Sequence, residues 1–377
     1  MLSELLFELK RCTSPTVNSA LPAQCYTSEL FFEHEIHTLF VNQWQCVGRV
    51  DEIARPGDYF TTQIVTGVKS IEPILVVRDK NNNINALSNV CRHRGMPVAS
   101  GCGNRGAFKC PYHAWTYHLD GRLRSAPLIN KSDLHENTRL PALATHIWQG
   151  FIFVNADENA VNPWQSLDTL HSLISNYHIE DFHHIDTFEE QWDCNWKSLV
   201  ENFMDAYHLS VVHTETLRHL TPTKLCEKLG HDTGWTAYAA NYAKNAPRRL
   251  EHHPSLTPDQ QHQSRLFCIF PGLLVSISAD TAVYLSLQPN GTNKINVKWG
   301  LSSYEPDLSE GEKEGRTRKW QAINAEDHSI LRRLQLGMES KFYQPGPLAT
   351  DNVEGALRDF HCFLAQSLSI DETQLTG

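Results

Sequence analysis

The spacing of apolar residues changes several times along the chain. Within residues 26–45, apolar side chains recur at roughly helical intervals, which predicts one amphipathic helix. Between about 47 and 157, short β-branched runs such as ILVVRD (74–79) and GFIFVN (150–155) alternate with clusters of Gly, Pro and Asn. That pattern is typical of a small antiparallel β domain.

The second half of the chain returns to helices and then to strands. Residues 160–230 have helical patterning and are dense in His and acidic residues. Strands follow within 265–304, and Asn290-Gly291 is a strong hairpin signal between the last two. Two helices are expected at 310–340 and 350–368, separated by the breaker run QPGPL.

The sequence therefore predicts an α+β protein. A β domain is inserted near the start of a larger domain, which combines an antiparallel sheet with helices. We expect an N-terminal helical segment at 1–45 that packs on the larger domain, the β domain at 46–157 and the larger domain at 158–377.

Composition narrows the classes of partner. The net charge of −10 argues against nucleic acid or an anionic membrane as the main partner, because both favour basic surfaces. We find no secretory signal and no uncharged run of about 18 apolar residues. The ten cysteines have no paired framework, so we expect a cytoplasmic protein whose cysteines are thiols or metal ligands.

Two Cys/His pairs stand out within CRHRGMPVASGCGNRGAFKCPYHAW, at residues 91–115. The first pair is Cys91 and His93, and the second is Cys110 and His113. Two thiolates and two imidazoles can hold tetrahedral zinc, or a 2Fe–2S cluster in which the cysteines bind one iron and the histidines the other.

The flanking residues favour the cluster. CRHRG followed by CPYHAW-x-Y-x-L-D-G resembles the Rieske motif of ring-hydroxylating and related Rieske non-haem iron oxygenases. Electron-transport Rieske proteins carry an extra Cys in each loop, where this chain has Met96 and Tyr112. Cys102 has no counterpart in the motif, and we interpret it as a loop thiol. The resemblance implies a Rieske domain at 46–157 and a helix-grip-like catalytic domain after it.

A second metal site is expected near His208 and His213. These histidines are five positions apart, which a straight helix would place about 140° apart, so they converge only if the helix is interrupted. By itself such a pair is weak evidence in a chain with 20 histidines. However, NWK-x3-ENF-x-D-x-YH-x4-H resembles the mononuclear-iron segment of the same family. There two His and one carboxylate hold Fe(II) and leave positions open for O2 and substrate.

The carboxylate ligand has no local signature. We choose Asp327, because AEDHSILRRLQ resembles the family's C-terminal helix, in which the Asp of an ED pair precedes a Gln eight residues on. For its neighbour Glu326 we expect the role of an exposed carboxylate in a first helical turn. The full set of candidates is Glu326, Asp327, Asp351, Glu354 and Asp359.

Asp205 lies three residues before His208, on the same helical face. A carboxylate there can orient the imidazole. The resemblance implies a further role: in the family, subunits form a head-to-tail ring, and this acid bridges a cluster histidine of one subunit to an iron histidine of the next. Here it would connect His113 to His208 of a neighbour, in a ring that is most simply a homotrimer. The sequence does not decide whether a small β subunit joins this ring.

The implied chemistry is oxygenation of a small molecule by O2. No convincing GxGxxG stretch is present, so electrons from NAD(P)H are expected through a separate reductase, with or without a ferredoxin. An aromatic or heteroaromatic substrate is our first expectation, because ENFMDAYH resembles aromatic hydroxylases. The alternative is a quaternary ammonium compound, since the N-terminal segment and the GPL segment resemble choline, glycine betaine and carnitine oxygenases.

Two further alternatives are a non-catalytic Rieske electron carrier, which leaves the second half unexplained, and a zinc-stabilised binding module. For the substrate pocket we expect contributions from the segment around the iron histidines and from the strands after residue 265. The candidate lining residues are Asn202, Phe203, Phe270, Leu274, Ile277 and Tyr284.

Overall fold

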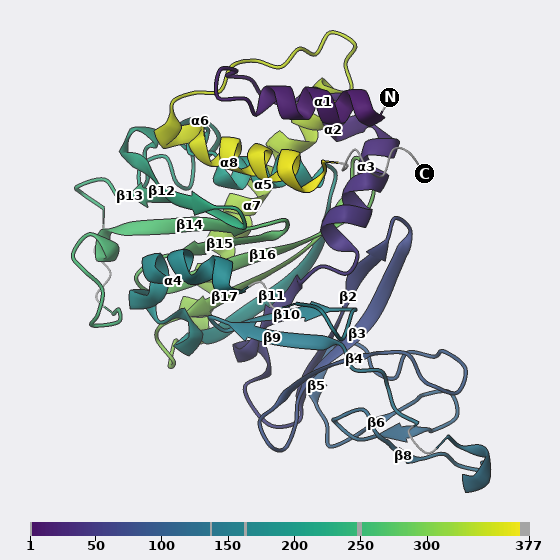
Figure 1. Ribbon diagram of the computed structural model, residues 1–377. Coiled ribbons are helices and arrows are strands. Elements are labelled where there is room, and N and C mark those ends of the chain that lie inside the picture. Colours follow the sequence, from purple (N-terminus) through teal and green to yellow (C-terminus); the bar gives the residue numbers. More distant parts are fainter. Residues whose placement is uncertain (1, 136–137, 162–163, 247–250, 370–377) are drawn as a thin grey trace. The chain divides into compact units, whose positions relative to one another are not determined.

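A computed structural model describes residues 2–135, 138–161, 164–246 and 251–369 (Figure 1). Backbone contacts divide the chain into two compact units. One is continuous, Phe40–Val161, and the other combines Met1–Leu39 with Asn162–Gly377. No helix in the described part of the chain is long and apolar enough to cross a membrane.

The continuous unit consists of three small antiparallel sheets, with strand orders β4-β3-β2-β5, β1-β10-β9 and β6-β7-β8. Because β1 pairs with β10, the strands at which the chain enters and leaves this unit lie side by side. The strands are β1 (Gln45–Arg49), β2 (Asp58–Gly67), β3 (Ser70–Arg78), β4 (Ile84–Ser88), β5 (Cys102–Asn104), β6 (Phe108–Lys109), β7 (Thr116–Tyr117), β8 (Leu123–Ser125), β9 (Ala144–Trp148) and β10 (Phe151–Asn155).

Strand β3 explains the uninterrupted apolar run in this unit. Successive side chains of a strand point to opposite faces. Leu75 and Val77 enter one core cluster together with the two motif cysteines, while Ile74 and Val76 enter a second cluster on the other face. Both faces of the strand are therefore buried.

The second unit is built on one seven-stranded antiparallel sheet, in the order β11-β17-β16-β15-β14-β13-β12. β16 and β17 form the hairpin expected at Asn290-Gly291, and Gly291 has the positive φ of 116° that favours glycine at a turn. The strands are β11 (His183–Trp192), β12 (Cys226–Asp232), β13 (Trp235–Asn241), β14 (Gln263–Ile269), β15 (Leu273–Ile277), β16 (Thr281–Pro289) and β17 (Ile295–Ser303).

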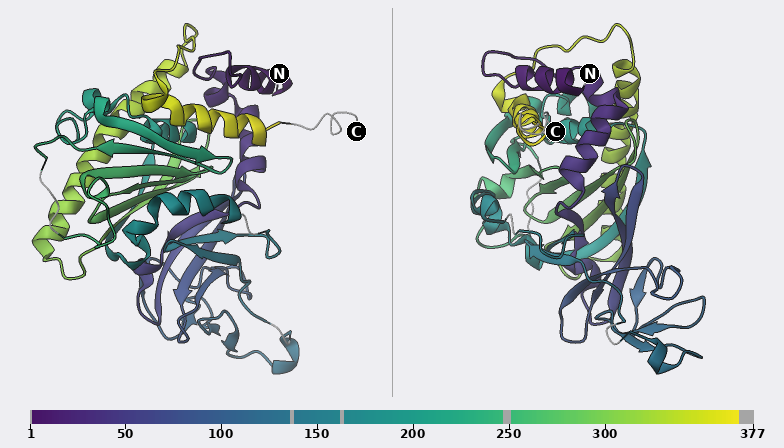
Figure 2. Two further views of the ribbon diagram at one scale, coloured as in Figure 1. Left: turned by 60° about the vertical axis from the view of Figure 1, so that its left-hand side comes forward. Right: turned by 45° about the vertical axis from the view of Figure 1, so that its right-hand side comes forward.

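Helices from both ends of the chain pack in this second unit (Figure 2). α8 packs on β12 and β13, α1 packs on α8, and α5 contacts both α7 and α8. The expectation of two C-terminal helices is confirmed. The helices are α1 (Leu2–Cys12), α2 (Gln24–Thr27), α3 (Glu29–Glu35), α4 (Asp168–Ile174), α5 (Trp196–Met204), α6 (Leu209–Val212), α7 (Glu310–Met338) and α8 (Asp351–Ser367).

Two local expectations were wrong. The single helix expected at 26–45 is split into α2, α3 and a π-helical turn, Ile36–Phe40, because Ser28 begins a new helix by accepting a hydrogen bond from the Phe31 N–H. The region 160–230 is not wholly helical, since it contains β11. This edge strand gains its hydrogen bonds by pairing with β17, and its own sequence shows no clear alternation.

Candidate metal centres and active site

Two loops of the unit Phe40–Val161 carry the Cys/His pairs, and they share one backbone geometry. In each loop the cysteine N–H donates to the carbonyl five residues on, at 2.9 Å for Cys91 and 2.8 Å for Cys110. The residue four positions on donates back to the cysteine carbonyl: Gly95 at 3.0 Å and Ala114 at 3.1 Å. Both of these residues have a positive φ, 77° and 61°, so each loop needs the left-handed conformation at the same place.

The side chains of the two loops offer two sulfur and two nitrogen donors. The Cys91 and Cys110 thiols are buried in a core cluster and free. The His93 and His113 rings lie 4.7 Å apart between centroids. His93 stacks on Trp115 and leaves its Nδ1 buried without a hydrogen-bond partner. A buried, unpartnered imidazole nitrogen beside two thiols and a second imidazole fits a bound metal group.

A tyrosine hydroxyl completes the surroundings of the first thiol. Tyr117 Oη lies 3.3 Å from Cys91 Sγ and accepts a hydrogen bond from the Arg92 N–H at 3.0 Å, so its own proton is available to the sulfur. Hydrogen bonds to cluster sulfurs are one of the means by which proteins set a reduction potential. Cys102 lies in strand β5 and is exposed.

The second set of donors forms where α5 ends. The helix stops at Met204, Asp205 adopts an extended backbone, and the short helix α6 separates His208 from His213. α6 ends at Val212 and His213 leaves the helical conformation, with a ψ of 54°, so the helix ends between the two histidines, as their five-residue spacing requires. Their Nε2 atoms lie 3.2 Å apart.

Asp327, in the middle of α7, brings the third donor. Its Oδ1 lies 3.2 Å from Nε2 of His213 and 3.6 Å from Nε2 of His208. The three ligand atoms lie within 4.8 Å of one another. Oδ1 is nevertheless buried and receives no hydrogen bond, so the donors converge on a common point and do not satisfy each other. This arrangement fits a cation held by two histidines and one carboxylate.

Each histidine also faces a carboxylate on its outer side. Glu326 Oε2 lies 2.9 Å from Nδ1 of His213 and accepts a short hydrogen bond from Thr216 Oγ1. Burial lowers the pKa of His213, but Asp327 and Glu326 outweigh it and raise the pKa above its ordinary value. The expectation of Glu326 as a first-turn carboxylate was wrong, because α7 begins at Glu310 and Glu326 lies far inside it.

Asp205 occupies the corresponding place at the other histidine. Its Oδ2 lies 3.3 Å from Nδ1 of His208, without the alignment of a hydrogen bond, and its Oδ1 accepts a short hydrogen bond from the Tyr207 N–H. Carboxylates in this position fix the tautomer and the orientation of a metal-binding imidazole.

The other candidate carboxylates lie elsewhere in contacts of their own. Asp359 pairs with Lys228 Nζ at 2.9 Å, and Glu354 accepts from the Ala349 N–H. The side chain of Asp351 is 72% exposed. Of the five acids considered from the sequence, Asp327 alone joins the two histidines in a cluster of potential ligands.

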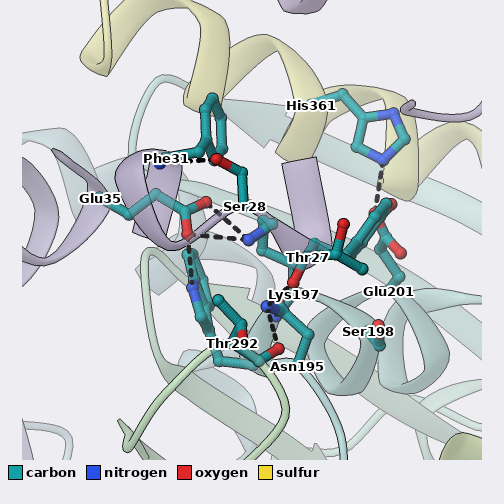
Figure 3. A network of polar contacts seen from close by, with 12 residues as sticks. Thr27, Ser28, Phe31, Glu35, Asn195, Lys197, Ser198, Glu201, Thr292 and His361 are labelled. Atoms are coloured by element: carbon teal, nitrogen blue, oxygen red, sulfur yellow. Dashed lines mark hydrogen bonds and ion pairs between the residues drawn. The ribbon is translucent and has the colours of Figure 1, made fainter. Parts of the chain in front are cut away.

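A buried polar network supports helix α5, which precedes His208 (Figure 3). Lys197 Nζ lies 2.7 and 2.8 Å from the two carboxylate oxygens of Glu35, and both side chains are fully buried. Trp196 Nε1 donates to the same carboxylate at 3.2 Å. One turn further along, Glu201 accepts from His361 Nε2 at 2.8 Å. The start of the helix is therefore fixed to α3, and its middle to α8.

A cavity enclosing about 900 Å³, part of it open to solvent, adjoins the His/Asp cluster. His208, His213 and Asp327 form one part of its wall. Four aromatic residues line it: Phe203, Tyr238, Tyr242 and Trp320.

The expected pocket residues divide into two groups. Asn202 and Phe203 line the cavity. Ile277 and Tyr284 are buried and point to the face of the sheet opposite Ser276, which does line it. The remaining two expectations also lie outside the lining: Leu274 shares a face with Ser276 but lies farther along β15, and Phe270 packs against Phe360 and Phe363.

Some residues of the wall were missed from the sequence. They include three short polar residues: Ser264 in β14, Ser276 in β15, and Ser278 directly after β15. Trp320 and Ile323 lie on α7 at three- and four-residue steps towards Asp327. That spacing was a usable signal, because residues at these steps share one face of a helix.

Comparison with known protein families identifies both halves of the chain. Residues 176–370 match the family described as ring hydroxylating alpha subunit (catalytic domain). Residues 43–144 match the Rieske 2Fe–2S domain. The first match spans more than half of the chain.

Individual relatives agree along nearly the whole length. The oxygenase subunit of carnitine monooxygenase from Acinetobacter baumannii is 27% identical, covering 92% of this chain and 93% of the relative. The oxygenase subunit of glycine betaine monooxygenase from Chromohalobacter salexigens is 28% identical, covering 87% and 81%.

Solved structures give the same result. A quaternary ammonium Rieske monooxygenase superposes on this chain with a TM-score of 0.82 at 25% identity. The structure of that enzyme gives insights into carnitine oxidation by gut microbiota and into inter-subunit electron transfer. It covers 95% of this chain and 98% of that one. Naphthalene 1,2-dioxygenase from Rhodococcus shares the fold, with a TM-score of 0.77 at 21% identity over 98% of this chain and 99% of that one.

Enzymes of this kind are oxidoreductases that carry a Rieske cluster and a mononuclear iron, and they work with a reductase, O2 and an organic substrate. Both donor sets described above fit these cofactors. The chain belongs to the ring-hydroxylating alpha-subunit family, as a terminal subunit of a Rieske non-haem iron oxygenase.

Proposed function

We propose that this oxygenase is a monooxygenase of a quaternary ammonium compound. The observation that carries the proposal is the likeness to carnitine and glycine betaine monooxygenases along nearly the whole chain, and the aromatic wall beside the His/Asp cluster, formed by Phe203, Tyr238, Tyr242 and Trp320, suits such a substrate. Aromatic faces attract a quaternary ammonium group, which cannot donate a hydrogen bond. Relatives that act on carnitine and glycine betaine support the same substrate class.

This proposal replaces our first expectation of an aromatic substrate. An aromatic ring would also pack against aromatic side chains, so the cavity walls alone do not separate the two classes. The relatives separate the two substrate classes. The naphthalene enzyme resembles this chain at only 21% identity, so it supports the fold alone and gives no argument for an aromatic substrate.

The residues of the two donor sets then take defined roles. Cys91, His93, Cys110 and His113 would hold the cluster, and His208, His213 and Asp327 would hold the mononuclear iron. The bound cofactors supply single electrons and O2 activation. Overall, one oxygen atom enters a C–H bond of the substrate and the other leaves as water, with two electrons from NAD(P)H through the reductase and two protons.

The chain's own side chains prepare the site for this reaction. Glu326 accepts a hydrogen bond from Nδ1 of His213, and Asp205 faces Nδ1 of His208, so both imidazoles present Nε2 inward. Leu209, Leu217 and Ile323 line the cavity beside the cluster of donors, so its wall is apolar there. An apolar wall around preorganised groups strengthens the electrostatic interactions between them.

For the assembly we propose a head-to-tail homotrimer, in which Asp205 connects His208 to His113 of a neighbour. Inter-subunit electron transfer in a related quaternary ammonium monooxygenase supports this arrangement. Residues 46–157 would then receive electrons, and residues 158–377, with the segment 1–45, would perform the oxygenation. A cytoplasmic location agrees with ten free cysteines.

The test is product formation by the iron-loaded protein with a surrogate reductase and NADH. Carnitine, glycine betaine, choline, naphthalene and indole are supplied singly, and hydroxylated or demethylated products are identified by mass spectrometry. We expect NADH oxidation coupled to product with a quaternary ammonium compound. Coupled hydroxylation of an aromatic compound, with none of the ammonium compounds converted, would refute the proposal.

A further inference from the structure

A buried hydrogen bond joins the two helices that carry the His/Asp cluster. α5 leads to His208, and Asp327 lies in the middle of α7. The N–H of Asn195, at the start of α5, donates to Gln335 Oε1 on α7 at 3.0 Å. Both residues are almost fully buried, with exposed fractions of 1% and 4%. Gln335 is eight residues beyond Asp327, about 12 Å along the helix axis, so the bond acts at a distance from the donors.

Asn195 is held in place from three further directions. Its Oδ1 accepts from the Lys197 N–H at 3.0 Å and so caps α5 (Figure 3). Its Nδ2 donates to the carbonyl oxygen of Tyr26 at 2.9 Å and to that of Thr292 at 2.8 Å. Both ends of the side-chain amide are therefore bonded, which fixes the backbone N–H of Asn195 towards one place on α7.

α7 turns one face towards α5 and the residues just before it. The Asp193 N–H donates to His328 Nε2 at 3.4 Å, and Ser198 Oγ donates to Met338 Sδ at 3.8 Å. His328, Gln335 and Met338 follow one another at steps of seven and three residues, so they share this face of the helix. Of the three printed contacts, the bond to Gln335 is the shortest and lies between the other two.

The position of Asp327 depends on how α7 lies along α5. Bond lengths at a metal site are set to within about 0.2 Å. Sliding α7 by one residue would move Asp327 by about 1.5 Å, which is enough to take its carboxylate away from the two histidines. Apolar packing is non-directional and does not fix such a register by itself. A directional hydrogen bond between the helices does.

We propose that Gln335 is a positioning residue of the mononuclear metal site. Its hydrogen bond to Asn195 sets the register of α7 on α5, and that register places Asp327 beside the two histidines. The inference rests on the ligand roles given under the proposed function and adds a residue that touches neither metal nor substrate. Without the Gln335 acceptor, the buried N–H of Asn195 gains a partner only if water enters or one helix shifts. Either change alters the distances among the three donors.

The test compares three variants of the iron-loaded protein. Gln335→Met keeps the length of the side chain and removes the acceptor. Gln335→Glu/Glu339→Gln restores an acceptor for the Asn195 N–H, because the amide and the carboxylate of the contact between residues 335 and 339, at 3.2 Å, exchange places. Thr236→Val is the matched control. It removes a buried hydrogen bond of the same unit, from Thr236 Oγ1 to Asp359 Oδ2 at 2.7 Å, which fastens β13 to α8.

Three properties are measured on each protein: Fe(II) retention at the mononuclear site against a chelator, the EPR spectrum of that iron after addition of nitric oxide, and the apparent Tm. Gln335→Met should weaken iron retention about 10-fold and change the rhombicity of the EPR signal, which reports the arrangement of the ligands. The exchanged pair should regain most of the retention and the natural signal. Thr236→Val should lower the apparent Tm, as Gln335→Met does, but leave retention and signal unchanged.

The outcomes separate a positioning role from a purely structural one. If Gln335→Met lowers the Tm but keeps the natural iron retention and EPR signal, the inference is overturned. Equal loss of iron in Thr236→Val, or no recovery in the exchanged pair, also overturns it. Gln335→Asn, which shortens the same amide by one methylene group, replaces Gln335→Met if that variant does not fold. Failure of the ligand roles looks different, because the natural protein would then retain no Fe(II) beyond its cluster.

Discussion

Replacing Lys197 with methionine should strongly destabilise the catalytic unit at neutral pH. Lys197 and Glu35 are both fully buried and in contact, so the variant leaves a carboxylate inside the protein without its cation. Removing one partner of a buried ion pair costs about 3–5 kcal/mol. For a unit of this size, that corresponds to a fall of roughly 6–20 °C in apparent Tm.

The loss should depend on pH in a defined direction. Burial raises the pKa of Glu35 above its ordinary value, and Lys197 opposes this rise, so in Lys197→Met the pKa rises further. The protonated carboxyl is tolerated in the interior. The stability contributed by the raised pKa is therefore fully present below the ordinary pKa of a glutamate and is lost as pH rises through the folded-state value. The penalty should be smaller at pH 5 than at pH 7.5.

The assay is thermal unfolding of iron-loaded protein at one scan rate, followed by circular dichroism at both pH values. Lys313→Met is the control, because its exposed pair with Glu310 contributes less than about 1 kcal/mol. In the double variant Lys197→Met/Glu35→Gln most of the stability should return, since no buried charge is left and Trp196 keeps its acceptor. If the double variant is as unstable as the single one and neither responds to pH, the loss comes from packing and the charge-burial reasoning is refuted.

Three further predictions concern the donor sets. Glu326→Gln should lower iron retention at the mononuclear site about 10- to 100-fold, as measured by chelator competition. The EPR signal of the reduced cluster should be unchanged. Equal loss of the mononuclear iron and the cluster would contradict a role of Glu326 at His213. Asp205→Asn should keep about three irons per chain by metal analysis but abolish turnover, and near-normal turnover would rule out the proposed link to a neighbouring cluster histidine. For Ala114→Gly the free energy of unfolding should stay within about 1 kcal/mol of that of the natural protein, and the visible spectrum should be unchanged. Ala114→Val should lose the cluster, because a β-branched residue is strained at φ 61°. Full cluster occupancy in the valine variant would show that the loop adopts another backbone conformation.

The sequence predicted the features that depend on residues close together in the chain. The two Cys/His pairs, the helix end between His208 and His213, and the β16–β17 hairpin each depend on residues within a short stretch. Asp327 came from a resemblance, because no local pattern marks a single carboxylate that joins the cluster from a distant helix.

Features that depend on tertiary contacts were missed. β11 acquires its strand structure by pairing with β17, and Glu326 acquires its role only because α7 passes beside His213. Asn202 and Phe203 of α5 line the cavity, but Leu274, Ile277 and Tyr284 were chosen on the wrong face of their strands or at the wrong position. Alternation predicts which side chains share a face of a strand but does not say which face lines the cavity.

The pairing of β1 with β10 has a consequence for how the protein is made on the ribosome. About 110 residues separate Gln45 from Val154, so at roughly 5–20 residues per second the cluster-binding unit is complete within about 5–20 s of its first strand. Asn18, by contrast, bonds to Leu348, which is 330 residues away and is synthesised roughly 15–65 s later. Helix α1 packs on α8 and must wait for that helix, while the cysteine loops are already formed. A nascent chain can therefore receive its iron–sulfur cluster before its oxygen-activating pocket exists.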